Sequence, residues 1–146
     1  RRFRGLPHRS QSLREYKGVL WVNDSKATNV GATRAAIESL APADGQLVLI
    51  AGGDAKGADL SPLVEAVTGR VRHLVLMGQD APALEEALGS RVASTRVSTM
   101  EEAVRVAAEQ ACAGDRVLLS PACSSLDQYS SYEARGDAFA RAVEAL

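Results

Sequence analysis

The sequence is poor in several features that would mark a particular class of protein. It has only two cysteines, 4% aromatic residues, and a net charge of −1 from 17 basic and 18 acidic residues. Two cysteines are too few for a disulfide framework, which favours reduced thiols and a cytoplasmic location. The balanced charge argues against a nucleic-acid or membrane-surface partner. No apolar run approaches membrane-spanning length. From the charge and the apolar runs together, we expect neither nucleic acid nor membrane as a partner.

Generic nucleotide-binding and metal-binding motifs are also missing. No G-x-G-x-x-G follows the first apolar run, which argues against a dinucleotide-dependent oxidoreductase. Gly52 and Gly57 have the spacing of a Walker A loop, but the lysine and hydroxyl residue that should follow are absent. His8 and His73 lack cysteine or carboxylate neighbours at ligand spacing, so we expect no metal site in this chain. We interpret His73 as a structural residue of a strand.

The first residues of the chain have the composition of a linker. Residues 1–11 are basic and irregular, with Gly5 and Pro7 as breaks. They do not start with methionine, and no apolar signal-peptide core follows them. We therefore expect a piece of a longer protein, with a linker at residues 1–11 and one domain at 12–146. That length is sufficient for a proper core.

Apolar periodicity alternates between strand and helix along the rest of the chain. Largely apolar runs predict strands at 19–23, 47–51, 71–77 and 116–119. A turn at Lys17-Gly18 predicts that 12–16 pairs with 19–23 as a hairpin, and a less apolar segment predicts a strand near 91–98. Helical spacing predicts helices that run to residue 40 after a cap at Thr28 or Asn29, and over 60–68, 81–88, 100–111 and 132–146. This alternation predicts a single α/β domain, with a doubly wound, mostly parallel, Rossmann-like sheet flanked by helices.

Three of the predicted strands, ending at Asp24, Ala51 and Leu119, lead into loops rich in small polar residues. Because the carboxyl ends of parallel strands share one edge of a sheet, these loops are expected to converge. The side chains brought within reach are Lys26, Thr28, Lys56, Ser120, Ser124, Ser125 and Asp127. Lysines among hydroxyls favour an anionic ligand such as a carboxylate or phosphate. The alternative is that each loop is polar only for turn chemistry and capping.

Four segments make the prediction more specific. They are GLPHR at 5–9, NDSKATN at 23–29, GGDAKGAD at 52–59 and SPACSSLDQY at 120–129. In this order they closely resemble the carboxy-terminal domain of the bacterial Mur ligases, in particular those that add D-glutamate. The resemblance implies a cytoplasmic, monomeric enzyme of peptidoglycan synthesis that uses ATP and Mg²⁺ to join D-glutamate to UDP-N-acetylmuramoyl-L-alanine. Residues 1–11 would then be the linker from a missing central ATPase domain, and 12–146 the D-glutamate-binding domain.

The resemblance also implies roles for particular residues. The positions that hold D-glutamate are Thr28, Lys56, Ser125, Leu126 and Tyr132, while Arg9 and Asp24 reach ATP and Lys26 is catalytic, beside the acyl phosphate. Relatives often carry phenylalanine at the position of Tyr132. A general base and the magnesium ligands belong to the central domain, so we expect this chain to be inactive alone.

Other functions fit parts of the pattern. The chain could be a stand-alone binding module for an acidic amino acid or a nucleotide, in which case a methionine would directly precede Arg1. An upstream G-x-x-x-x-G-K-[ST] would instead favour the ligase. A Mur ligase that adds diaminopimelate or lysine should offer an extra carboxylate for the substrate amine, and the three loops show none. Cys123 has no histidine near it in the sequence, so we interpret it as a buried structural residue rather than a nucleophile.

Overall fold

The computed structural model describes residues 9–125 and 128–146. Within them, one six-stranded sheet has the order β1-β2-β6-β3-β4-β5. The strands are β1 (Gln11–Tyr16), β2 (Val19–Asn23), β3 (Leu47–Gly52), β4 (Val71–Met77), β5 (Ser94–Arg96) and β6 (Arg116–Leu119). β1 pairs antiparallel with β2, and the other neighbours pair in parallel. The predicted mostly parallel α/β sheet is therefore confirmed.

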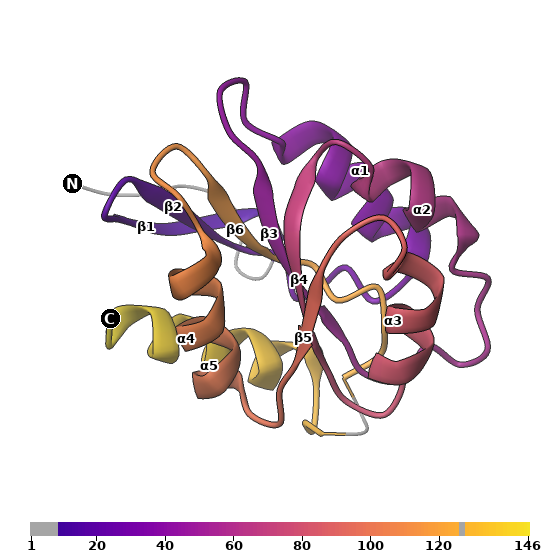
Figure 1. Ribbon diagram of the computed structural model, residues 1–146. Helices are drawn as coiled ribbons and strands as arrows, with labels where there is room; N and C mark the ends of the chain where they lie inside the picture. The colour runs from indigo at the N-terminus through magenta and orange to yellow at the C-terminus, as the bar shows by residue number, and fades with distance from the viewer. Residues whose placement is uncertain (1–8, 126–127) are drawn as a thin grey trace.

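Helices cover both faces of this sheet (Figure 1). They are α1 (Val30–Leu40), α2 (Ser61–Val67), α3 (Ala81–Leu88), α4 (Met100–Gln110) and α5 (Tyr132–Glu144). α1, α2 and α3 pack on one face, and α4 and α5 pack on the other. No helix in the described part of the chain is long and apolar enough to cross a membrane.

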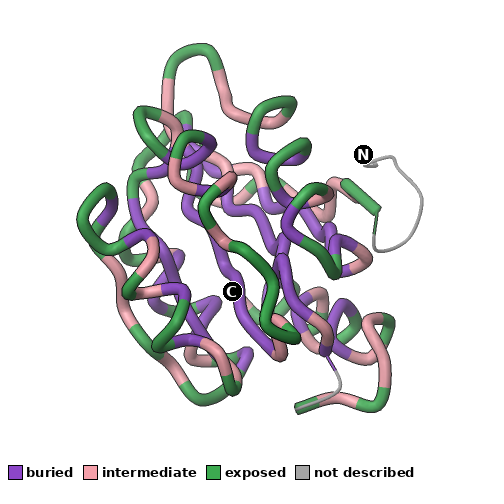
Figure 2. Tube along the Cα trace, turned by 90° about the vertical axis from the view of Figure 1, so that its right-hand side faces the viewer, coloured by how far each residue is buried: buried purple, intermediate pink, exposed green. Residues whose placement is uncertain are grey.

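The core is split into two layers by the alternation of strand side chains. In β3, Leu47 and Leu49 contact the layer under α1 to α3, whereas Val48 and Ile50 contact the layer under α4 and α5. Successive side chains of a strand point to opposite faces, so a strand covered on both sides must be apolar throughout. Figure 2 shows the buried strands enclosed by helices whose outer turns are exposed.

The strand order places β6 between β2 and β3, although β6 comes last along the chain. β2 and β3 are followed by α1 and α2 on one face, and β6 is followed by α5 on the other. Neighbouring strands whose connections leave to opposite faces open a crevice at their carboxyl ends, where ligands of such sheets bind. The strand order therefore predicts a ligand site among the loops after β2, β3 and β6.

Candidate functional site

The loops after β2, β3 and β6 begin at the same level of the sheet and are bonded to one another. Asn23 of β2 and Ile50 of β3 both lie opposite Leu119 of β6. Further out, the Ala122 N–H donates to the Ala27 carbonyl at 3.0 Å. Asp54 and Ser124 exchange two backbone hydrogen bonds of 2.9 Å. The predicted convergence of the three loops is confirmed.

A cavity of about 310 Å³ lies between the three loops and the start of α5. It brings together Thr28, Lys56, Ser125 and Tyr132, four of the residues that the sequence singled out. Thr28 and Lys56 are exposed, Ser125 is buried and Tyr132 is half-buried. Asp54 also lines the cavity, and its Oδ1 accepts from the Lys56 N–H. The Lys56 ammonium and several hydroxyl donors suit a compact anionic ligand. We call this cavity the acceptor pocket.

Lys56 is presented from a tight turn. Its backbone has a φ of 54°, in the left-handed region that few residues other than glycine adopt. The turn is held because the Lys56 N–H donates to Asp54 Oδ1 at 2.8 Å and the Ala55 N–H donates to Asp80 Oδ2 at 2.7 Å. Sparsely populated backbone conformations persist where the surroundings over-determine them, often at functional sites.

A second cavity, of about 390 Å³, lies between the β2 loop and α1 and is lined by Arg9, Asp24 and Lys26. The Asp24 carboxylate accepts from the Ser10 N–H at 2.9 Å and from Ser120 Oγ at 3.1 Å. Burial nevertheless raises the pKa of Asp24 above its ordinary value, because it outweighs these hydrogen bonds and the nearby Arg9 charge. We call this cavity the basic pocket.

Lys26 and Tyr132 connect the two pockets. Lys26 lines the basic pocket and Tyr132 lines the acceptor pocket. The ammonium of Lys26 lies 3.2 Å from the Tyr132 hydroxyl and 4.7 Å from the centre of its ring. A charge held at this boundary can act on groups in either pocket.

Arg135 is the main site residue that the sequence did not reveal. It is 2% exposed, and its guanidinium donates to Ser25 Oγ at 3.0 Å and to the carbonyls of Ser25 at 2.9 Å, Cys123 at 3.0 Å and Gly52 at 3.4 Å. One side chain of α5 thereby holds all three loop regions. The sequence does contain a clue to Arg135. Its spacing places it on the same helical face as the buried Phe139 and Val143, where an arginine is unexpected.

Other predicted residues lie elsewhere. Ser120 is buried beneath Asp24, with its hydroxyl bonded to Asp24 and Thr33, so it supports a site residue rather than lining a pocket. Cys123 is buried, as expected for a structural cysteine. His73 is also buried, which lowers its pKa, and its Nε2 lies 2.8 Å from Thr95 Oγ1. The predictions on His8, Leu126 and Asp127 fall outside the described residues.

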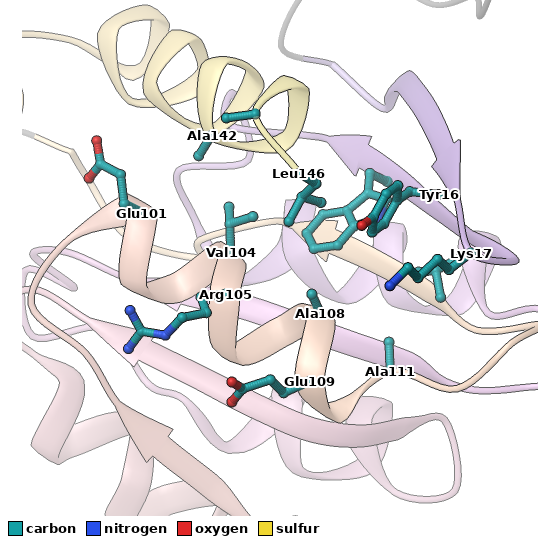
Figure 3. Close-up of a pocket in the computed structure, with 13 residues that line it drawn as sticks. Tyr16, Lys17, Glu101, Val104, Arg105, Ala108, Glu109, Ala111, Ala142 and Leu146 are labelled. Carbon is teal, nitrogen blue, oxygen red and sulfur yellow. The ribbon is translucent and has the colours of Figure 1, made fainter.

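A larger cavity, of about 500 Å³, lies at the opposite end of β2 among β1, α4 and α5. Figure 3 shows Tyr16, Val104 and Leu146 facing one another there, with the charged ends of Lys17, Arg105 and Glu109 further out. Its walls are largely apolar, and it lies away from the three converging loops. Although this cavity is the larger one, its apolar walls and its distance from the three loops argue against it as the candidate site.

The described residues offer no cluster of three or more histidine, cysteine or carboxylate side chains able to hold a metal ion. The fold is that of an α/β domain with two polar cavities at the switch point of its sheet, the place where ligands of such sheets bind. The family described as "Mur ligase, glutamate ligase domain" matches residues 8–123, and the chain belongs to this family.

Curated relatives agree with this assignment over the whole chain. It is 55% identical over 146 residues to the UDP-N-acetylmuramoylalanine–D-glutamate ligase of Marinobacter nauticus, covering 100% of this chain and 33% of that protein. It is 57% identical over 145 residues to the ligase of the same name from Pseudomonas aeruginosa, covering 99% of this chain and 32% of that protein. The chain thus spans about a third of the length of these relatives.

Solved structures share the fold. A bifunctional folylpolyglutamate synthase/dihydrofolate synthase from Yersinia pestis, in complex with AMPPNP and a manganese ion, matches with a TM-score of 0.65 and 25% identity. That match covers 94% of this chain and 31% of the synthase. The MurF ligase of Thermotoga maritima matches with a TM-score of 0.64 and 21% identity, covering 97% of this chain and 32% of that protein.

Proposed function

We propose that this chain is the carboxy-terminal, D-glutamate-binding domain of a longer ligase of peptidoglycan synthesis. That enzyme would use ATP to join D-glutamate to UDP-N-acetylmuramoyl-L-alanine in the cytoplasm. The proposal is supported by the family match and by relatives that carry the name of this ligase. The observation that carries it is the acceptor pocket, where side chains from three separate loops converge around a cavity of about 310 Å³.

The chemistry of the acceptor pocket fits an amino acid with two carboxylates. Lys56 supplies the positive charge, and Thr28 and Ser125 supply hydroxyl donors on the other sides of the cavity. Hydrogen bonds to a carboxylate from a charged donor are about twice as strong as neutral ones. We propose that these three residues hold the D-glutamate carboxylates and leave its amine directed toward the second substrate.

The charges of the basic pocket fit the phosphate groups of ATP and of the acyl phosphate. Arg9 and Lys26 offer positive charge, while the carboxylate of Asp24 can accept from ribose hydroxyls of ATP. In the full enzyme the substrate carboxylate would be activated as an acyl phosphate, and the D-glutamate amine would displace phosphate to form the amide. Lys26, at the boundary of the pockets, would stabilise the negative charge that develops on the tetrahedral intermediate.

Magnesium and a general base would come from the rest of the ligase. The described residues contain no metal-ligating cluster, and we propose that the central domain of the longer ligase would hold Mg²⁺. This chain would then bind and orient one substrate, and we expect it to show no ligase activity alone. A purified sample of the 146-residue chain that forms the amide product would contradict this.

Binding is tested by titrating the isotope-labelled chain with D-glutamate while amide shifts are recorded. We expect saturable shifts at Thr28, Lys56 and Ser125 with D-glutamate and none with L-glutamate or D-alanine. Equal shifts with both glutamate enantiomers would favour the alternative, a general binding module for acidic amino acids.

The substitution Lys56→Ala in the full-length ligase tests the same assignment by kinetics. We expect the KM for D-glutamate to rise about tenfold or more, because loss of a charge-assisted hydrogen bond costs about 1.5–3 kcal/mol. The KM for ATP should be the same as in the wild type. The matched control is Lys17→Ala, which removes an exposed lysine at the far end of β2. An unchanged KM for D-glutamate in the Lys56 variant would refute the assignment.

A further inference from the structure

The Lys26 ammonium is held by the aromatic side chain of Tyr132 in two ways. The distance from Lys26 Nζ to the Tyr132 hydroxyl is 3.2 Å, and the distance to the ring centre is 4.7 Å. An ammonium group has three donors and no acceptor, so the tyrosine oxygen accepts this hydrogen bond. The face of the ring attracts the same charge through its quadrupole. Both contacts favour one position of the ammonium.

Both partners are themselves attached to the same rigid frame. Tyr132 is the first residue of α5, whose N-cap Ser131 accepts from the Ala134 N–H at 3.0 Å. The Tyr132 carbonyl accepts from Ser25 Oγ at 2.7 Å, and Ser25 directly precedes Lys26. The backbone of Tyr132 is thereby bonded to the loop that carries the lysine.

This restraint matters because a lysine side chain is long and flexible. Ordering it costs up to about 2 kcal/mol in conformational entropy. A catalytic charge helps most when it is in place before the transition state forms, since no reorganisation is then needed. The hydroxyl and ring of Tyr132, which lines the acceptor pocket, supply that order in advance to Lys26, which lines the basic pocket.

We propose that Tyr132 is a positioning residue, whose hydroxyl fixes the Lys26 ammonium between the basic pocket and the acceptor pocket. The inference rests on the proposed ligase function and adds to it a role for the tyrosine oxygen. A phenylalanine here keeps the ring contact and the wall of the acceptor pocket, but loses the hydrogen bond. The oxygen therefore acts on turnover through Lys26 and not on the affinity for D-glutamate.

The kinetic test is Tyr132→Phe in the full-length ligase. We expect kcat to fall about threefold to tenfold, the range that corresponds to the net contribution of a single hydrogen bond partly exposed to solvent. The KM values for D-glutamate and ATP should stay within twofold. The matched control is Tyr16→Phe, because Tyr16 also has a cation over its ring, with Lys17 Nζ at 5.4 Å, but lies at the far cavity. An unchanged kcat, or a raised KM for D-glutamate with unchanged kcat, would overturn the proposal.

A spectroscopic test examines the contact without relying on ligase activity. The chain contains three lysines, Lys17, Lys26 and Lys56, so lysine-selective labelling gives few signals. We expect an upfield ring-current shift of the Lys26 ε-methylene protons that survives in Tyr132→Phe and disappears in Tyr132→Leu. The Lys26 ammonium protons should exchange with water faster in Tyr132→Phe than in the wild type.

The two tests separate the possible failures. Lys26 signals that do not respond to either substitution would overturn the proposed contact, whatever the kinetics show. A wild-type ligase without D-glutamate-dependent ATP turnover would refute the proposed function, while the lysine signals would still report the contact.

Discussion

Replacing Arg135 by methionine tests whether one buried side chain holds the candidate site together. Methionine has a similar length and good helix propensity, so the change chiefly removes the guanidinium donors. It leaves the carbonyls of Ser25, Gly52 and Cys123 without the bonds they accept in the wild type. These three carbonyls belong to the three segments that form the site.

The expected cost follows from the number and burial of these bonds. A buried acceptor left unsatisfied costs about 1–3 kcal/mol, and losses within one network are not additive, so we expect about 3–5 kcal/mol in total. A chain of 146 residues has a free energy of unfolding on the order of 7–22 kcal/mol. The variant should therefore stay folded, with its melting temperature lowered by about 10 °C.

Two measurements check this expectation. Urea denaturation gives the free energy of unfolding, and hydrogen exchange reports the Asp54 and Ser124 amides, which bond the β3 loop to the β6 loop. Both amides should lose protection in Arg135→Met. The control is Arg141→Met, the same change at an exposed position of α5. If the two variants are equally stable, or if loop protection survives in Arg135→Met, the account of Arg135 is wrong.

Three further expectations concern stability. Gly53→Ala should destabilise the fold by at least about 2 kcal/mol in urea denaturation, because its Cβ would lie 2.1 Å from the Ser124 carbonyl oxygen at a φ of +133°. Gly57→Ala, where nothing lies within 4 Å, should cost less. Hydrogen bonds from Arg72 and from backbone N–H groups hold the pKa of Asp115 below its ordinary value despite burial. The charged carboxylate therefore stabilises the fold at neutral pH, and this contribution is lost as the pH falls through the lowered pKa. The Asp115→Asn variant lacks this contribution. Its free energy of unfolding should therefore lie further below that of the wild type at pH 7 than at pH 3. Burial raises the pKa of Asp24, so its charge opposes folding at neutral pH. Asp24→Asn should raise the melting temperature at pH 7, less so at low pH, while weakening ATP binding in the full-length ligase.

Most of the fold could be predicted because its strands are buried on both faces. Largely apolar runs predicted β4 and β6 with the bounds that the structure has, and Asn29 caps α1 as one of the two residues proposed. The weakest prediction was the strand at 91–98, of which only Ser94–Arg96 forms β5. Among the residues that the structure describes, β5 pairs only with β4, at the edge of the sheet, so tertiary pairing and not local pattern sets its length.

The candidate site was predictable only where topology determines it. Parallel strands bring their carboxyl-end loops together, so the meeting of Thr28, Lys56 and Ser125 followed from the sequence. The assignment of loop residues to two pockets depends on where α1 and α5 leave the sheet, which a linear pattern does not contain. Strand alternation could have placed Ser120, since Leu118 and Leu119 face opposite layers and Ser120 continues toward α1.

The side chains that shape the site differ from those that we expect to bind. Asn23, Ser25 and Arg135 are buried and bond the loops to one another and to α5. Thr28 and Lys56, in contrast, are exposed at the mouth of the acceptor pocket. Because an exposed side chain contributes little to stability, such positions can change without loss of the fold. We therefore expect the buried frame to fix where a small anion would bind, and the side chains that line the acceptor pocket, the exposed Thr28 and Lys56 with the buried Ser125, to select it.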